Sequence, residues 1–191
     1  MTETDILYGY FGVFEIEKVD IFEYIRMNKD DFLWERGFRP AFTEEKYIRS
    51  DEKRRIILTP ACIFEVEIEP QPKNIADEQL EKTRSLIKEL RDIIAPDAEI
   101  RQKDLKYILL FHQPPNIETL LPRWYLTAVG RSNIKLKGFK TFIEDIKEEK
   151  VRQTKVLLKI KEGVLEIKIV SPDLDLAKGL VDSIRKSCQG E

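Results

Sequence analysis

The residues best suited to binding chemistry lie in a segment without acids. No Asp or Glu occurs between Glu118 and Glu144, although acids number 35 in this chain of 191 residues. Cations alternate there with aromatic rings: Arg123, Trp124, Tyr125, Arg131, Lys135, Lys137, Phe139, Lys140 and Phe142. Cations bind phosphates and aromatic rings stack on exposed bases. The segment therefore predicts a surface that binds nucleic acid or another polyanion.

A second basic and aromatic cluster lies earlier in the chain. The tetrad Arg36-Gly37-Phe38-Arg39 resembles Lys137-Gly138-Phe139-Lys140, and the two glycines are 101 positions apart. The predicted phosphate-binding residues are Arg36, Arg39, Arg123, Arg131, Lys135, Lys137 and Lys140, with Trp34 and Trp124 as stacking rings. In the alternative interpretation, the rings belong to the core and the cations balance acids of the chain or of a partner. A net charge of -2 argues against a large nucleic-acid footprint.

Catalytic and metal-binding motifs are missing from the sequence. It has no phosphate-binding glycine loop, no dinucleotide fingerprint, no nucleophile elbow and no paired-cysteine motif. His112 is the single histidine, which excludes a site built from several histidines. A catalytic pocket would require His112, Tyr125 and carboxylates to converge, and no spacing in the sequence indicates that they do. No catalytic residue, metal or cofactor is assigned.

Carboxylates recur at every second position in one predicted strand. Glu65, Glu67 and Glu69 alternate there with apolar residues, so they share one face of a sheet. Such a row could hold a hard cation through its oxygens. The favoured interpretation is a solvated sheet face, with basic residues of a neighbouring strand as partners.

The composition is typical of a folded intracellular protein. Charged residues make up 36% of the chain and hydrophobic residues 42%, which is too hydrophobic for a disordered chain. No apolar run reaches the roughly 18 residues that span a membrane, and the N-terminus lacks the cationic start of a signal peptide. We expect a soluble cytoplasmic protein with no membrane partner. Abundant Lys and Glu with few amides indicate a thermophilic source, and the alternative is a mesophilic protein with an unusually charged surface. Cys62 and Cys188 are expected to be core residues.

Hydrophobic periodicity predicts six strands and three helices. The predicted strands are Ile6–Ile16, Arg54–Thr59, Cys62–Glu69, Leu105–His112, Lys155–Lys161 and Val164–Val170. Long amphipathic helices are predicted over Asp77–Ile94 and Pro172–Cys188, the second with Ser171 as N-cap and Pro172 at its first position. A shorter helix is predicted after Gly138, because its apolar residues have helical spacing: Phe139, Phe142, Ile143 and Ile146.

The offset of 101 residues recurs beyond the glycine tetrads. It aligns Ile56-Ile57 with Leu157-Leu158, and the strand Ile63–Ile68 with Val164–Ile169. This repeat predicts an α+β protein with two related halves, residues 1–96 and 97–191. Each half would contribute an antiparallel sheet with a long amphipathic helix on one face. The halves are expected to pack closely or to form a single domain. The alternative is convergence on a common hairpin-plus-helix pattern.

A duplicated α+β half with a C-terminal helix on an antiparallel sheet is similar in outline to TATA-box-binding proteins and other saddle-like folds. The similarity concerns architecture and maps none of that family's residues onto this chain. It does not by itself imply a function.

Three classes of function follow from these observations. The first hypothesis is a non-catalytic binding module whose basic and aromatic surface contacts a polyanion, with binding that weakens steeply as salt rises. The second is a scaffold protein that acts through a homo-oligomer or a hetero-complex. The third is an enzyme or small-ligand carrier with a pocket between the halves.

Overall fold

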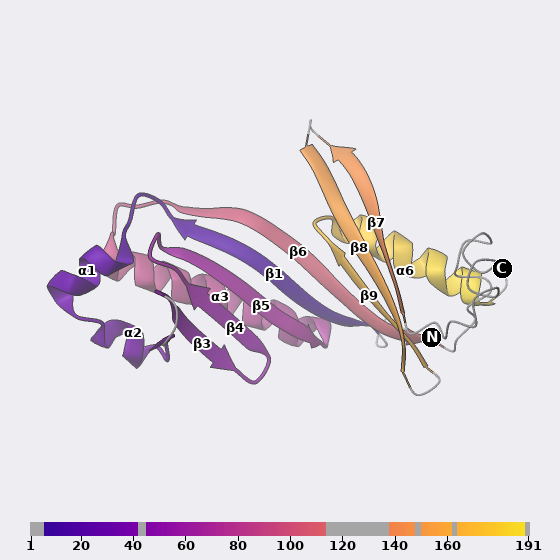
Figure 1. Cartoon of the computed structure of the whole chain (residues 1–191), viewed down its shortest axis with the longest axis horizontal. Coiled ribbons are helices and arrows are strands. Elements are labelled where there is room, and N and C mark those ends of the chain that lie inside the picture. Colours follow the sequence, from indigo (N-terminus) through magenta and orange to yellow (C-terminus); the bar gives the residue numbers. More distant parts are fainter. Residues whose placement is uncertain (1–5, 42–44, 114–137, 148–149, 162–163, 190–191) are drawn as a thin grey trace. The chain divides into compact units, whose positions relative to one another are not determined.

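The computed structural model divides the chain into two compact units. It describes residues 6–41, 45–113, 138–147, 150–161 and 164–189. The first unit spans Tyr8–Lys106, and the second combines Met1–Leu7 with Tyr107–Glu191. Helices accompany a single antiparallel sheet in the described residues (Figure 1). The predicted α+β class is therefore confirmed.

The first unit contains most of the helices. Its elements are β1 (Leu7–Ile16), α1 (Ile21–Asn28), α2 (Asp31–Glu35), β2 (Arg39–Pro40), β3 (Tyr47–Asp51), β4 (Arg54–Leu58), β5 (Ile63–Gln71), α3 (Lys73–Ile94) and the start of β6 (Ile100–Gln113). Its strands lie in the order β2-β3-β4-β5-β1-β6. The predicted first strand and the β4–β5 hairpin are confirmed. The helix predicted over Asp77–Ile94 is confirmed as α3, although it begins four residues earlier, at Lys73. The predicted division at residue 96 lies in the turn between α3 and β6.

The core of the first unit lies between α3 and one face of the sheet. Phe64, Val66 and Ile68 of β5 are fully buried, whereas the glutamates between them are exposed. α3 packs on β5 and buries Ile87 and Leu90. Each fully buried apolar side chain contributes about 1.5 to 3 kcal/mol of transfer free energy. The alternation of β5 therefore decides which sheet face the helix covers, as the sequence predicted.

The second unit repeats the combination of hairpin and helix. Its elements are the end of β6, β7 (Gly138–Lys147), β8 (Lys150–Lys161), β9 (Val164–Ser171) and α6 (Leu174–Gln189). Its strands lie in the order β6-β9-β8-β7. Ile167 and Ile169 of β9 are fully buried, and α6 packs on β9 with Ala177 and Val181 buried. The predicted β8–β9 hairpin and the C-terminal helix are confirmed. In the described part of the chain, no helix has the length and apolar character that crossing a membrane requires.

The prediction of a short helix after Gly138 is wrong. Residues 138–147 form the strand β7, which pairs antiparallel with β8 from Phe139 opposite Leu158 to Ile146 opposite Val151. The segment is rich in aromatic and β-branched residues, which favour strands. Pairing along the whole of β7 also satisfies its backbone groups on one side. Tertiary pairing therefore prevails over the helical spacing of its apolar residues.

The predicted start of the C-terminal helix is also wrong, because the helix begins two residues after Pro172. α6 begins at Leu174, and the Asp173 carboxylate accepts hydrogen bonds from the backbone N–H groups of Asp175 and Leu176. Ser171 belongs to β9, where it pairs with Tyr107. Its hydroxyl accepts a hydrogen bond from the Asp173 N–H and lies 2.8 Å from the Thr154 hydroxyl. Because Ser171 is held in the sheet, Asp173 caps the helix.

Candidate functional site

Most of the predicted phosphate-binding residues are beyond what the structure describes. Those outside the described residues are Arg123, Trp124, Arg131, Lys135 and Lys137. Lys140 lies in β7, at the register position opposite Leu157 of β8. The role of this basic segment therefore stays a prediction. The remaining candidates, Trp34, Arg36 and Arg39, all lie in the first unit.

Arg36 connects two helices of the first unit. Its guanidinium Nη2 lies 2.5 Å from the Glu89 carboxylate of α3, and its Nη1 donates to the Phe32 carbonyl at 2.8 Å. The side chain is 20% exposed. A phosphate contact would require Arg36 to share or leave Glu89, so its present contacts hold α2 against α3.

Trp34 and Arg39 form a cation–π pair at the surface. The Arg39 guanidinium lies 4.5 Å from the centre of the Trp34 ring, and its Nη1 donates to the backbone carbonyls of Trp34 and Phe38. The Trp34 indole N–H and the Tyr47 hydroxyl both donate to the Asp30 carboxylate. One face of the Trp34 ring is therefore covered by Arg39.

The hydrogen bonds around this pair shift the pKa values of Asp30 and Tyr47. The hydrogen bond from Trp34 holds the pKa of Asp30 below its ordinary value, although burial opposes that shift. Burial, with the hydrogen bond to Asp30, raises the pKa of Tyr47 to about 12. Asp30 thus stays charged and Tyr47 stays protonated at neutral pH, which fixes the orientation of Trp34.

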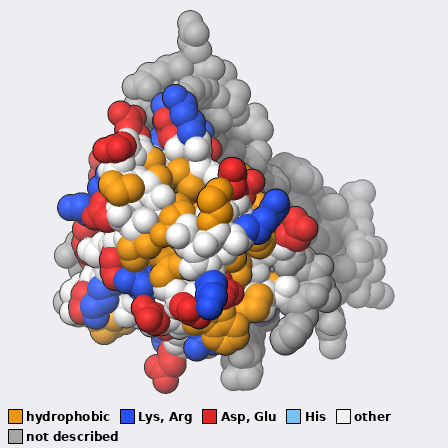
Figure 2. All heavy atoms as spheres, turned by 90° about the vertical axis from the view of Figure 1, so that its left-hand side faces the viewer, with side chains coloured by type: hydrophobic (Ala, Val, Ile, Leu, Met, Phe, Trp, Pro, Cys, Tyr) orange, Lys and Arg blue, Asp and Glu red, His pale blue; other side chains and the backbone are white. Residues whose placement is uncertain are grey.

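The surface at the α1 and α2 end of the first unit has mixed charge. Figure 2 shows acidic and basic side chains interspersed around hydrophobic atoms on this face. Cations surrounded by acids create a weaker field than a row of cations alone. This face is therefore not uniformly basic.

A row of cations that the sequence analysis missed lies in the second unit. Lys155 and Lys159 of β8 are exposed, and Lys168 of β9 is partly exposed. The register places Lys168 opposite Leu157, so it lies between the two β8 lysines along the strand direction. The buried residues Ile167 and Ile169 point to the α6 side. Because side chains alternate between faces, the three lysines lie on the face opposite to α6.

His112 lies next to this row, on the neighbouring strand β6. Glu166 pairs with both Lys159 and His112 in the sheet register, and the His112 Nε2 lies 3.7 Å from the Glu166 carboxylate. Half-buried apolar residues fill the space between the charges: Leu110, Leu157 and Val170. We call the set His112, Lys155, Lys159, Glu166 and Lys168 the basic face. Glu166 is the one acid in this set.

The signal for the basic face was a difference between the two hairpins. The offset of 101 residues places Glu166, Lys168 and Val170 where the first hairpin has Glu65, Glu67 and Glu69. At these three positions the first hairpin therefore has three acids, whereas the second hairpin has one acid and one cation. The face itself could be assigned only after the buried side of β8 was known.

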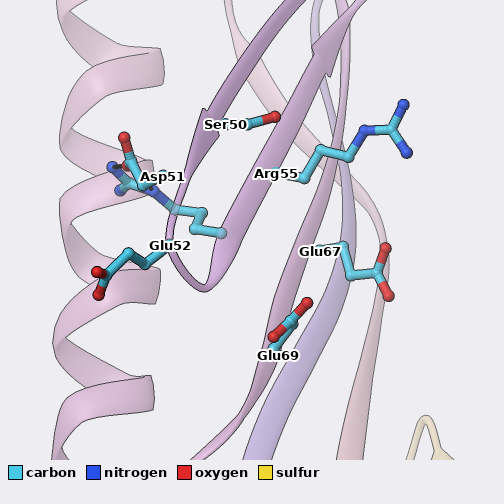
Figure 3. Close-up of a pocket in the computed structure, with 7 residues that line it drawn as sticks. Ser50, Asp51, Glu52, Arg55, Glu67 and Glu69 are labelled. Carbon is cyan, nitrogen blue, oxygen red and sulfur yellow. Dashed lines mark hydrogen bonds and ion pairs between the residues drawn. The ribbon is translucent and has the colours of Figure 1, made fainter.

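On the equivalent face of the first unit, β5 carries a row of acids. Glu65, Glu67 and Glu69 of β5 are exposed, and Arg55 of β4 lies opposite Glu67. We call these four residues the acidic face. Figure 3 shows Arg55 and Glu67 projecting away from α3. They line a hollow of about 270 Å³ with Ser50, Asp51, Glu52, Arg54 and Glu69.

The whole sequence shows the same separation of charge. Residues 8–106 carry 18 Lys and Arg against 22 Asp and Glu, a net charge of -4. The remaining residues carry 15 Lys and Arg against 13 Asp and Glu, a net charge of +2. The overall charge of -2 is therefore the sum of a net negative first unit and a net positive second unit.

Two observations concern metal binding and thiol chemistry in the described residues. They contain no group of three or more His, Cys, Asp or Glu side chains arranged to hold a metal ion. Cys62 is fully buried, and burial with the charge of Asp20 raises its thiol pKa to about 12. Such a thiol is protonated and unreactive at neutral pH.

Comparisons with known proteins assign this chain to no group. No protein-family model matches it, and no curated protein matches its sequence. The interpretation of function therefore depends on the distribution of charge and apolar side chains described above.

Proposed function

We propose that this protein is a non-catalytic binding module that contacts a nucleic acid or another polyanion through the basic face. The carrying observation is that Lys155, Lys159 and Lys168 share one sheet face with His112. Two acids occupy positions on the same face, Glu166 of β9 and, by its register with Gln153, Glu144 of β7. Cations arranged in this way bind phosphates by releasing counterions, which makes binding depend on salt. The apolar side chains between the lysines exclude water from the contact.

The acid-free segment extends the same proposal. Lys140 lies on β7 opposite Leu157, so its position adjoins the basic face across one strand. The net charge of +2 outside residues 8–106 includes the other predicted cations of this segment. We infer that these cations also bind the polyanion, with Trp124 as a stacking ring. Arg36, Arg39 and Trp34 would contribute only by giving up contacts within the first unit.

The experiment compares two triple charge reversals in equilibrium binding to labelled single-stranded and duplex oligonucleotides. The test variant is Lys155→Glu/Lys159→Glu/Lys168→Glu. The matched control is Lys53→Glu/Lys82→Glu/Lys88→Glu, which changes the net charge equally at exposed positions of the first unit. Each lost phosphate contact weakens binding several-fold at low salt. We expect the test variant to lose about 100-fold or more in affinity and the control to lose far less. Equal losses would show that only net charge matters.

We also infer that the two units arose by internal duplication. β5 begins at Ile63 and β9 at Val164, while α3 begins at Lys73 and α6 at Leu174. Both pairs of elements are offset by the 101 positions that separate the glycine tetrads. In an experimental structure, β4, β5 and α3 should superimpose on β8, β9 and α6 at that single offset. A best superposition at another offset would favour convergence.

A further inference from the structure

The acidic face and the basic face have the same spacing of charge. Glu65, Glu67 and Glu69 stand at every second position of β5, so they are about 6.8 Å apart along the strand. On the basic face, Lys168 lies opposite Leu157, midway between Lys155 and Lys159. The three lysines therefore also recur about every 6.8 Å along the strand direction.

The charges of the acidic face remain available to a partner. Among the described residues, Glu65, Glu67 and Glu69 have no cation within ion-pair distance. Arg55 lies beside Glu67 in the register and offsets part of the negative charge. Lys106 lies on the other side of Glu67, 5.9 Å from the ring of Phe11, and it pairs with Asp104 at 2.8 Å. On the neighbouring strand β1, Glu15 is already held by Lys103 at 2.6 Å. Glu17 is likewise held by Arg101 at 2.8 Å, so the three glutamates of β5 are the acids of this group that have no ion pair among the described residues.

Both faces also carry apolar side chains between their charges. Val13, Ile57 and Ile63 are half-buried beside the glutamates, and Leu110 and Leu157 are half-buried beside the lysines. Stacked sheets interdigitate such side chains at a separation of about 10 Å. The apolar residues would supply attraction, and the charges would set the register and exclude wrong partners.

We propose that copies of this chain associate, with the basic face of one copy stacked on the acidic face of another. Every copy carries one row of each sign, so a second copy presents the complementary row at matching spacing. This inference goes beyond polyanion binding and does not require it. It adds one consequence that does rest on the proposed function: a polyanion on the basic face competes with self-association.

The test measures the molar mass of the full chain by light scattering over a range of concentrations. At low salt, we expect a mass that rises with concentration above the 22.5 kDa of one chain. At high salt, the mass should fall toward 22.5 kDa, because exposed charges are screened. A mass of one chain at every concentration in low salt would overturn the proposal.

Exchanging the charges gives the sharper test. One variant carries Lys155→Glu/Lys159→Glu/Lys168→Glu and has two acidic rows; the other carries Glu65→Lys/Glu67→Lys/Glu69→Lys and has two basic rows. Each variant alone should be monomeric, because like charges face each other. An equimolar mixture should associate again. A mixture that stays monomeric, with both variants folded by circular dichroism, would contradict the contact.

A milder pair covers the case in which a triple variant fails to fold. Lys159→Glu and Glu67→Lys should each weaken association, and their mixture should recover part of it. An oligonucleotide added to the wild-type protein should lower its mass toward one chain. If the charge exchange succeeds and the oligonucleotide has no effect, association stands and polyanion binding fails. If the oligonucleotide binds a protein that is always monomeric, polyanion binding stands and self-association fails.

Discussion

At the residue scale, two glycines in different surroundings give a direct test of the packing. A Cβ at Gly9 would lie 2.5 Å from the Ile68 carbonyl oxygen, whereas a Cβ at Gly179 would meet no atom within 4 Å. Gly9 therefore permits β1 to approach β5 closely at the irregularity between Tyr8 and Tyr10. Gly179 lies inside α6, where glycine weakens a helix.

We predict opposite effects of alanine at these two positions. Gly9→Ala should lower the free energy of unfolding by about 1 to 3 kcal/mol, because backbone atoms must shift. Gly179→Ala should raise it by about 0.5 to 1 kcal/mol through helix propensity. Denaturant unfolding of both variants measures these changes. A neutral Gly9→Ala variant would contradict the close approach of the strands.

A second prediction at this scale concerns acid stability. Burial raises the pKa of Asp51, but the hydrogen bond and charge of Arg54 outweigh burial and hold it below its ordinary value of 3.8. Because the folded pKa is depressed, this stabilisation is complete above the unfolded pKa. It is lost as the pH falls through the folded pKa.

Removing the Asp51 charge should weaken the dependence of the free energy of unfolding on pH in the acidic range. Arg54 is only 6% exposed and also donates to the Thr83 hydroxyl, so it depends on Asp51 for charge compensation. We expect Asp51→Asn to cost about 1 to 2 kcal/mol at neutral pH and less at pH 3. Chemical unfolding at several pH values gives the profile. The exposed neighbour Glu52 provides the control Glu52→Gln, and equal profiles for both variants would argue against the Arg54 contact.

At the element scale, the capping of α6 is a testable correction of the sequence analysis. Asp173 accepts two backbone hydrogen bonds at the helix start. We predict that Asp173→Ala costs about 1 kcal/mol in unfolding free energy and that Asp173→Ser, which retains a capping oxygen, restores most of it. Thermal unfolding of both variants checks this. If Asp173→Ser is as unstable as Asp173→Ala, a capping role for Asp173 is refuted.

The elements that the sequence predicted correctly have a single strong periodicity. β5 alternates between buried Val66 and exposed Glu67, and α3 has an apolar stripe that ends before Pro96. β7 could not be predicted in this way, because its apolar residues fit a helix and only pairing with β8 decides the outcome. Local pattern is sufficient where one face is buried, and it fails where the partner strand supplies the stabilisation.

The candidate site was less predictable than the fold for the same reason. Lysines of β8 stand among leucines and valines, and the sequence does not show which face is buried. Burial of Val156 and Ile169 identifies that face. Lys155 and Lys159 must then lie on the other face, next to Lys168. Binding surfaces on sheets require the register between strands, which a single strand does not encode.

At the scale of the whole molecule, separation of charge matters more than net charge. A net charge of -2 suggests little affinity for polyanions, yet residues 8–106 carry -4 and the remaining residues carry +2. The same separation gives each copy a complementary surface for another copy. Both proposed contacts depend on the basic face, and both weaken as salt rises.

The salt dependence of oligonucleotide binding tests this account most directly. The logarithm of the binding constant falls with the logarithm of salt concentration, with a slope of roughly 0.7 to 0.9 for each phosphate contact. For the wild-type protein we predict a slope magnitude of about 2 to 4. Lys159→Glu should reduce it by about 1. Absence of binding at the lowest salt concentration, or a slope that Lys159→Glu leaves unchanged, would contradict the proposal that the basic face binds polyanions.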